Sequence, residues 1–376
     1  MFSAVVSIFT GLSYAELSSM FPKAGAEYEY TLKAFGKRIA FIIGWLIILS
    51  GIVGSATVAL GFAGYFNALS AFPVFSAALL LIIALSLVIF YGIKESAWLA
   101  IIFTIIESAG LIIVIFTGVP YFGSVDYFAM PRGMPGIFEA AALIFFAYIG
   151  FEGIVKLSEE TKEPEKTIPR GLLLAIFIST VLYITVAVSA VSVAGWEKLS
   201  LSDAPLADIV FIALGGDAFV FLSVIALFAT ANTVLLMMLS SSRIIYGMAQ
   251  AFSLPGVLAR VHPERRTPWV AILAVAAFTM LFVASGSISL VAGVTNFMLF
   301  VTFIVINGAL ILLRYREPAL QRPFRVPVNI GKLPILPLAG IVSCAFMLLQ
   351  LRLEVIVIGT VLTAAGAALS LVEMRQ

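Results

Sequence analysis

The sequence predicts an all-α integral membrane protein. Of its 376 residues, 62% are hydrophobic and 11% are charged, and the mean hydropathy of +1.14 is too apolar for a soluble domain. The apolar residues form long continuous runs, as a bilayer-spanning helix of roughly 20 residues requires. Regular alternation over runs of roughly 10 residues, which a membrane β-barrel would show, is rare. We therefore expect a bundle of transmembrane helices.

Eleven apolar segments are predicted as transmembrane helices. They are residues 1–20, 39–66, 72–92, 96–118, 136–155, 171–195, 217–248, 268–286, 288–313, 333–351 and 354–372. The second segment is rich in small residues, such as Gly51 and Gly54. Small residues let helix backbones approach closely in a membrane, so we expect this segment at the centre of the bundle.

Basic residues distinguish the two sides of the predicted bundle. If the first loop is inside, 19 of the 22 lysines and arginines are inside, and only Arg132, Lys198 and Arg352 are outside. The positive-inside rule then fixes the orientation. The first segment would start outside, so either eleven helices follow an outer N-terminus or a further helix precedes Met1. We favour the second interpretation.

Several function classes are excluded by composition and motifs. Cys344 and His262 are single residues of their kinds, so we expect no intrachain disulfide and no cysteine or histidine metal site. The net charge is +2, without an extended basic segment that would indicate nucleic acid. No GxxxxGK[ST], HExxH or GxSxG motif occurs. We expect no enzyme and no cofactor, and any uphill transport would draw on an ion gradient.

Glu107 is the sharpest candidate for a functional group, because about ten apolar residues flank it on each side. A carboxyl group near the bilayer midplane should be protonated, paired or bound to a cation. It is therefore a candidate proton-coupling site. The alternative is a neutral, hydrogen-bonded acid with a structural role.

A second candidate is the stretch FFAYIGFEG, from Phe145 to Gly153, where Glu152 has a glycine on either side. An interrupted helix inside a membrane is tolerated only where it is buried in protein or lines a cavity, and transporters use such half-helix ends to hold charged substrate groups. The alternative is a helix that ends early at the inner interface.

Polar residues in the seventh segment are weaker candidates. Thr230, Asn232 and Thr233 could line a path or coordinate a small cation. Hydroxyl groups in membrane helices often bond only to their own backbone, and this alternative is favoured for each hydroxyl taken singly.

Four stretches of the sequence, spread over nearly the whole chain, resemble the amino acid–polyamine–organocation (APC) transporter superfamily. They are LSYAELSSMFPKAGAEYEYTLKAFG, FFAYIGFEGIVKLSEETKEPEKTIPRG, SSSRIIYGMAQ and EPALQRPFRVP. The second and fourth are the most specific, and all four stand in the order and spacing of the family.

The resemblance implies a twelve-helix scaffold with a 5+5 inverted repeat of the LeuT type. Our eleven segments then match family helices 2–12, and family helix 1 has no match in this sequence. The chain would be a single transmembrane domain, 1–376. Residues 1–118 would be the remainder of the first repeat, 136–313 the second repeat, and 333–372 two additional helices.

The resemblance also implies where a substrate binds, at family helices 1 and 6. The fifth segment matches helix 6, which is unwound in the family. Its carbonyl groups would receive a substrate ammonium, and Phe146 matches an aromatic gate position. The substrate-binding residues implied are Phe145, Phe146, Ala147, Tyr148, Ile149 and Gly150. Amides for the substrate carboxylate would come from the glycine-rich break of family helix 1.

One position departs from the family pattern. Many proton-coupled members have a lysine, thought to replace a sodium ion, where this sequence has Glu107. The reversed charge leaves the coupling ion open. Candidate ion or proton residues are Glu107, Glu152, Thr230, Asn232 and Thr233, with a proton expected and sodium as the alternative.

The sequence thus predicts a secondary transporter of amino acids or related amines in the plasma membrane. Its expected partners are the small-molecule substrate and the lipid bilayer, and the oligomeric state stays open. Two alternatives remain: an exchanger of amines such as polyamines, and a non-transporting relative that acts as a sensor or partner or is a nonfunctional fragment.

Overall fold

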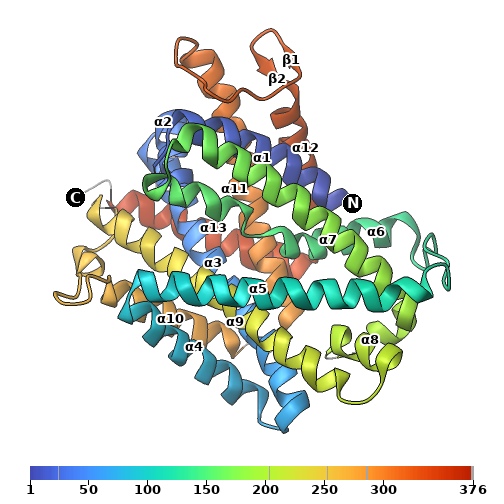
Figure 1. The fold of residues 1–376 in the computed structure, drawn as a ribbon. Helices are drawn as coiled ribbons and strands as arrows, with labels where there is room; N and C mark the ends of the chain where they lie inside the picture. Colours follow the sequence, from blue (N-terminus) through green and yellow to red (C-terminus); the bar gives the residue numbers. More distant parts are fainter. Residues whose placement is uncertain (24, 203, 252, 285–286, 374–376) are drawn as a thin grey trace.

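The computed structural model describes residues 1–23, 25–202, 204–251, 253–284 and 287–373 and is almost entirely helical (Figure 1). The α-helices are α1 (Phe2–Met20), α2 (Ala26–Phe35), α3 (Lys37–Ser70), α4 (Val74–Tyr91), α5 (Ile93–Gly118), α6 (Gly133–Ile144), α7 (Pro164–Leu199), α8 (Pro205–Leu214), α9 (Ala218–Gln250), α10 (Trp269–Val283), α11 (Ile288–Arg316), α12 (Ile335–Leu349) and α13 (Leu353–Glu373). Short 3-10 helices are η1 (Val119–Tyr121), η2 (Phe145–Tyr148), η3 (Phe151–Glu160) and η4 (Gly256–Ala259), and a small antiparallel hairpin joins β1 (Asn329–Ile330) to β2 (Leu333–Pro334).

Each of the eleven predicted segments lies on a helix, but only eight described helical stretches are long and apolar enough to cross a membrane. The count of eleven spans is therefore not confirmed for α1, α10 and α12. Helices α10 and α12 have 15 residues each, or about 22 Å at 1.5 Å per residue, which is shorter than a hydrocarbon core of roughly 30 Å. In α1, buried serines, Thr10 and Glu16 dilute the apolar residues. The 5+5 repeat remains a prediction.

Two helices lie where no segment was predicted. Helices α2 and α8 have ten residues each, too few for a span. In α2 the buried residues Ala26, Tyr30 and Ala34 recur every four positions, so one face of this helix packs on the bundle. Helix α8 begins at Pro205, and proline is favoured in the first turn of a helix.

Helix α3 is the central helix, as its small residues predict. It packs against α9 and α11, and most of its membrane-spanning part is buried. Figure 1 shows α5 across the front of the bundle, with α7 above it. The contact between α3 and α9 is close at Gly51, where an added Cβ would lie 1.9 Å from Ser241 Oγ.

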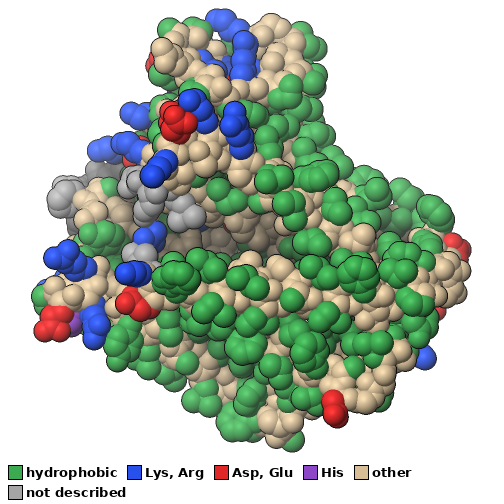
Figure 2. Space-filling view, viewed as in Figure 1, with side chains coloured by type: hydrophobic (Ala, Val, Ile, Leu, Met, Phe, Trp, Pro, Cys, Tyr) green, Lys and Arg blue, Asp and Glu red, His purple; other side chains and the backbone are tan. Residues whose placement is uncertain are grey.

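A buried ion network joins α1, α11 and the loop before β1. Glu16 is fully buried and accepts hydrogen bonds from Arg314 Nη2, from Arg314 Nε at 2.9 Å and from the Val326 amide at 2.7 Å. Arg322 Nε lies 3.3 Å from the same carboxylate. In Figure 2, lysine and arginine side chains gather at the top and left, toward the hairpin and α2. The network thus fastens the loop at the end of the bundle that we expect to be cytoplasmic.

We expect Gly51→Val to destabilise the protein, because the added side chain must push α3 away from α9. Overpacking of this kind costs about 1–3 kcal/mol. Gly61→Val is the matched control on the same helix, since an added Cβ there meets nothing within 4 Å. Thermal unfolding in detergent measures the difference, and equal melting temperatures of the two variants would contradict the close contact.

Replacing Glu16 by alanine should destabilise the protein by about 3–5 kcal/mol, because it leaves Arg314 buried without its counter-charge. Glu354→Ala, which removes an exposed carboxylate paired with Arg352 at 3.8 Å, is the control. Both variants are compared by thermal unfolding. A melting temperature of Glu16→Ala close to that of the control would show that the network contributes little.

Candidate functional site

The helix that begins as α6 is interrupted inside an apolar span. Helix α6 ends at Ile144 and continues as the 3-10 turns η2 and η3. Between these turns Ile149 is extended and Gly150 has a φ of +119°, which side-chain-bearing residues rarely adopt. The stretch 133–156 is apolar enough to cross a membrane, so the predicted interruption is a feature of the fold. We call residues 145–150 the break.

Side chains from three other helices bind carbonyl groups next to the break. Ser3 Oγ of α1 donates to the Ala141 carbonyl at 2.8 Å. Asn296 Nδ2 of α11 donates to the carbonyls of Ala142 and Leu143 at 2.8 and 3.0 Å, and Tyr183 Oη of α7 donates to the Ala147 carbonyl at 2.7 Å. These bonds tie α1, α11 and α7 to the last turn of α6 and to the break, while the Ala141 carbonyl also keeps its helical bond from the Phe145 amide.

The side chains of the break differ in how far they are buried. Phe145 is fully buried, with its ring centroid 4.7 Å from that of Phe300, and Tyr148 packs edge-on against Tyr183 at 5.3 Å. Phe146 and Ile149 are half-buried, and Ala147 and Gly150 are exposed. Figure 2 shows a hollow directly above the side chains of α5, along the line that η2 and η3 follow in Figure 1.

Glu107 on α5 lies beside Asn232 on α9. Asn232 is buried, and its Nδ2 donates at 3.0 Å to Thr104 Oγ1, which is three positions before Glu107 on the same helix. Asn232 Oδ1 has no hydrogen-bond partner among the described residues. Two of the predicted candidates, Glu107 and Asn232, are thus brought together where α5 packs on α9.

The hydrogen bonds of the two threonines on the same helix do not join them to this group. Thr230 Oγ1 donates to the carbonyls of Ala226 and Leu227, and Thr233 Oγ1 donates to that of Ala229. Both hydroxyls therefore bond to the backbone of α9, as expected for a structural role.

Glu152 lies in a different environment, at the inner side of the break. It is buried and accepts a hydrogen bond from the Gly150 amide at 2.9 Å. Electrostatic interactions connect it with Lys156 and Glu27. Lys156 Nζ lies 3.8 Å from Glu27 and donates to Ser240 Oγ at 3.2 Å.

Tyr14 donates a hydrogen bond to Glu27 at 3.3 Å. We use the name inner cluster for five residues: Tyr14, Glu27, Glu152, Lys156 and Ser240. It holds two carboxyl groups and one ammonium group and joins α1, α2, η3 and α9. Burial and the Glu27 carboxylate raise the pKa of the neighbouring Tyr30 well above its usual value, so that phenol stays protonated.

Several of these residues were missed by the sequence analysis. Asn296 has the clearest signal, because an asparagine in the apolar run VTNFMLF must find a buried partner. Glu27 was missed because its helix, α2, was treated as a loop. Tyr183 has no distinguishing signal, since tyrosine is common in apolar helices and only its position beside Ala147 reveals a role.

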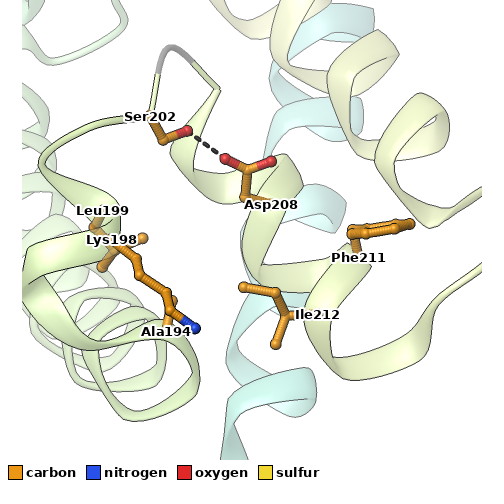
Figure 3. Close-up of a pocket in the computed structure, with 7 residues that line it drawn as sticks. All are labelled: Ala194, Lys198, Leu199, Ser202, Asp208, Phe211 and Ile212. Atoms are coloured by element: carbon orange, nitrogen blue, oxygen red, sulfur yellow. Dashed lines mark hydrogen bonds between the residues drawn. The ribbon is translucent and has the colours of Figure 1, made fainter.

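Of two cavities among the described residues, one lies away from the break and the other reaches Leu143, at the end of α6 that leads into the break. One of about 170 Å³ lies between α7 and α8, where Asp208 accepts a hydrogen bond from Ser202 and Lys198 lies at the edge (Figure 3). Another, of about 250 Å³, is lined by Arg132, Glu139 and Arg352, among others. No group of three or more metal-ligating residues occurs in the described part of the chain.

Comparisons with known proteins identify similar sequences. A family model described as amino acid permease matches residues 1–372. The branched-chain amino acid permease BcaP of Bacillus subtilis is 30% identical over 371 residues, which are 93% of this chain and 79% of that protein. The methylthioribose transporter of the same organism is 30% identical over 363 residues, or 90% and 77%. The vacuolar cationic amino acid transporter 4 of Arabidopsis thaliana is 29% identical over 350 residues, or 84% and 57%.

We expect Gly150→Ala to disturb the break, because alanine at a φ of +119° is strained by about 1–3 kcal/mol. Gly153→Ala is the matched control. An added Cβ meets nothing within 4 Å at either glycine, and only Gly150 has a positive φ. Melting temperatures in detergent give the comparison, and a Gly150→Ala variant as stable as Gly153→Ala would show that the backbone at this position is not constrained.

Proposed function

The chain belongs to the amino acid permease family of the APC superfamily, and we propose that it transports an amino acid or a related amine by alternating access, driven by a proton gradient. Its relatives are transporters rather than enzymes. It is a multi-pass membrane protein, and we propose the plasma membrane as its location. The relatives are named as transporters of branched-chain amino acids, methylthioribose and cationic amino acids, so the substrate of this chain has to be measured.

The observation that supports transport most strongly is the break itself. The C-terminal end of α6 carries the negative end of its helix dipole and lies inside a stretch that is apolar enough to cross a membrane. This arrangement suits a substrate ammonium group. Phe146, Ala147 and Gly150 reach the surface at the break, where a substrate would enter.

Glu107 is the proposed coupling group. Glu107 is half-buried beside the amide of Asn232, and no described ion pair includes Glu107. A carboxyl group that is partly removed from water beside a neutral amide favours a bound proton, with sodium, held by carboxylate and hydroxyl oxygens, as the alternative. Glu152 would act separately in the inner cluster, whose Lys156–Glu27 contact has to open before substrate leaves.

The test is uptake by the reconstituted full chain in liposomes with an acidic exterior. Radiolabelled leucine, arginine and putrescine represent neutral amino acids, cationic amino acids and polyamines. Concentrative uptake of one of them supports the proposal, counterflow without net proton movement supports an amine exchanger, and the absence of both supports the non-transporting alternative. A sodium gradient at equal pH distinguishes the coupling ion.

Glu107→Gln should reduce pH-driven accumulation by at least about tenfold, within the range of coupling energies between two binding sites, while counterflow continues. The variant keeps a hydrogen-bonding amide but cannot release a proton. Glu139→Gln is the control, because this carboxylate lies at the outer end of α6 and pairs with Arg132 at 2.9 Å. Accumulation by Glu107→Gln at the wild-type level would exclude Glu107 as the proton carrier.

A further inference from the structure

The cavity that Arg132, Glu139 and Arg352 line lies where the ends of several helices meet, and we call it the outer cavity. Its volume is about 250 Å³, and its lining comes from the first part of α6, the start of α11 and the turn that joins α12 to α13. The predicted orientation puts all of these ends on the outer side of the membrane. Along α6 the outer cavity reaches Leu143, two residues before the break. A ligand in it would therefore lie between the outer surface and the proposed substrate site.

Glycine residues shape two walls of the outer cavity. At Gly136 an added Cβ would lie 2.6 Å from Arg132 Cβ, so a side chain there would displace the stem of Arg132. At Gly293 an added Cβ would lie 2.9 Å from Val355 Cγ2, so α11 packs closely on α13. The first glycine lets the Arg132 side chain lie over α6 and place Nη2 2.9 Å from Glu139 Oε2.

The charged side chains of the outer cavity are not equally paired. Arg132 and Glu139 neutralise each other through their contact at 2.9 Å. Arg352 Nη1 lies 3.8 Å from Glu354 Oε1, which is too long for a hydrogen bond. Among the described residues, no hydrogen bond of the Arg352 guanidinium is formed in this cavity. The lining therefore carries a net charge of one cation, whose N–H donors are free to bind an anion.

The chemistry of the outer cavity suits a small carboxylate. A guanidinium group matches a carboxylate or a phosphate in a bidentate arrangement. A volume of about 250 Å³ is smaller than the roughly 300–1,000 Å³ of pockets for drug-sized ligands, and it suits a molecule of the size of one amino acid. Basic residues are scarce on this side, since only three are predicted outside, and two of them, Arg132 and Arg352, line this one cavity.

We propose that the outer cavity is a binding site in which Arg352 receives the carboxylate of an amino acid before the substrate moves to the break. This inference rests on the proposed transport function and narrows its substrate class to molecules that carry a carboxylate. A fixed positive charge at the entrance raises the local concentration of such a substrate. The Arg132–Glu139 pair is closed on itself and supplies no group to the ligand.

The test is Arg352→Gln in the reconstituted full chain, with leucine or arginine as the probe, whichever the wild-type protein takes up. We expect the KM for uptake to rise about three- to tenfold, because a charge-assisted hydrogen bond to the carboxylate is lost. Arg352→Lys keeps the charge but not the planar fork, so its KM should lie between those of the wild type and Arg352→Gln. Lys198→Gln is the matched control, because Lys198 is the third basic residue predicted outside and lines the other cavity. Its KM should equal that of the wild type.

Two further measurements distinguish ligand binding from a structural role of Arg352. In the wild type the KM should rise with salt, because screening weakens an exposed charge contact, and Arg352→Gln should lose this dependence. Ala140→Phe fills the outer cavity while Arg352 stays intact, because Ala140 is exposed and belongs to the lining. It should also raise the KM. Met134→Phe is its control, since Met134 is exposed on the same helix and is not part of the lining.

A KM of Arg352→Gln equal to that of Lys198→Gln, or a KM of Ala140→Phe equal to that of Met134→Phe, would overturn the outer site. An effect of Arg352→Gln that disappears in liposomes of neutral phosphatidylcholine would also overturn it and would assign Arg352 to a lipid phosphate. Uptake of putrescine but of neither amino acid would overturn it as well, because putrescine has no carboxylate, and would leave amine transport standing. The absence of all uptake by the wild-type protein would instead overturn the proposed function, so the failures are distinguishable.

Discussion

The constraint on which the site depends is that a polypeptide inside a membrane must satisfy its backbone hydrogen bonds within the protein. An unbroken helix does this by itself, whereas the stretch from α6 to η3 cannot. Side chains bind backbone groups in and next to this stretch: Ser3 from α1, Asn296 from α11 and Tyr183 from α7 donate to carbonyls, and Glu152 of η3 itself accepts a hydrogen bond from the Gly150 amide. The break is consequently a meeting point of several helices, and movement of any of them changes its shape.

The two candidate acidic groups, far apart in sequence, have different surroundings. Glu107 lies on α5 where this helix packs on α9 beside Asn232. Glu152 reaches the break directly, on the side of the inner cluster. The neighbours of the two carboxyl groups differ in kind, because the amide of Asn232 accompanies Glu107 whereas Lys156 and Glu27 accompany Glu152. In the proposed transport cycle, a proton at Glu107 and the Lys156–Glu27 ion pair would therefore act separately.

Much of the fold follows from patterns that the sequence displays directly. Long apolar runs give the helices, and the small residues of 39–66 give the central position of α3 against α9. The predicted count of eleven transmembrane spans was not confirmed for three apolar segments. Helices α10 and α12 are apolar but too short for full spans, and α1 has buried polar residues that only its neighbours explain. Helix α2 was overlooked because a ten-residue amphipathic helix resembles a loop in hydropathy.

The sequence by itself determined the membrane class, the family resemblance and the presence of an isolated carboxyl group at Glu107, because each depends on residue type and local spacing. It indicated an interruption around Gly150, which the resemblance favoured over a helix that ends early. Only the tertiary structure decided which side chains serve those features. Asn232 lies beside Glu107 while Thr230 and Thr233 bond to their own helix, and Tyr183 rather than a neighbouring residue binds Ala147. The physical reason is that hydrogen bonds between helices depend on how α5, α7 and α9 are rotated and packed, and packing is a property of the whole bundle.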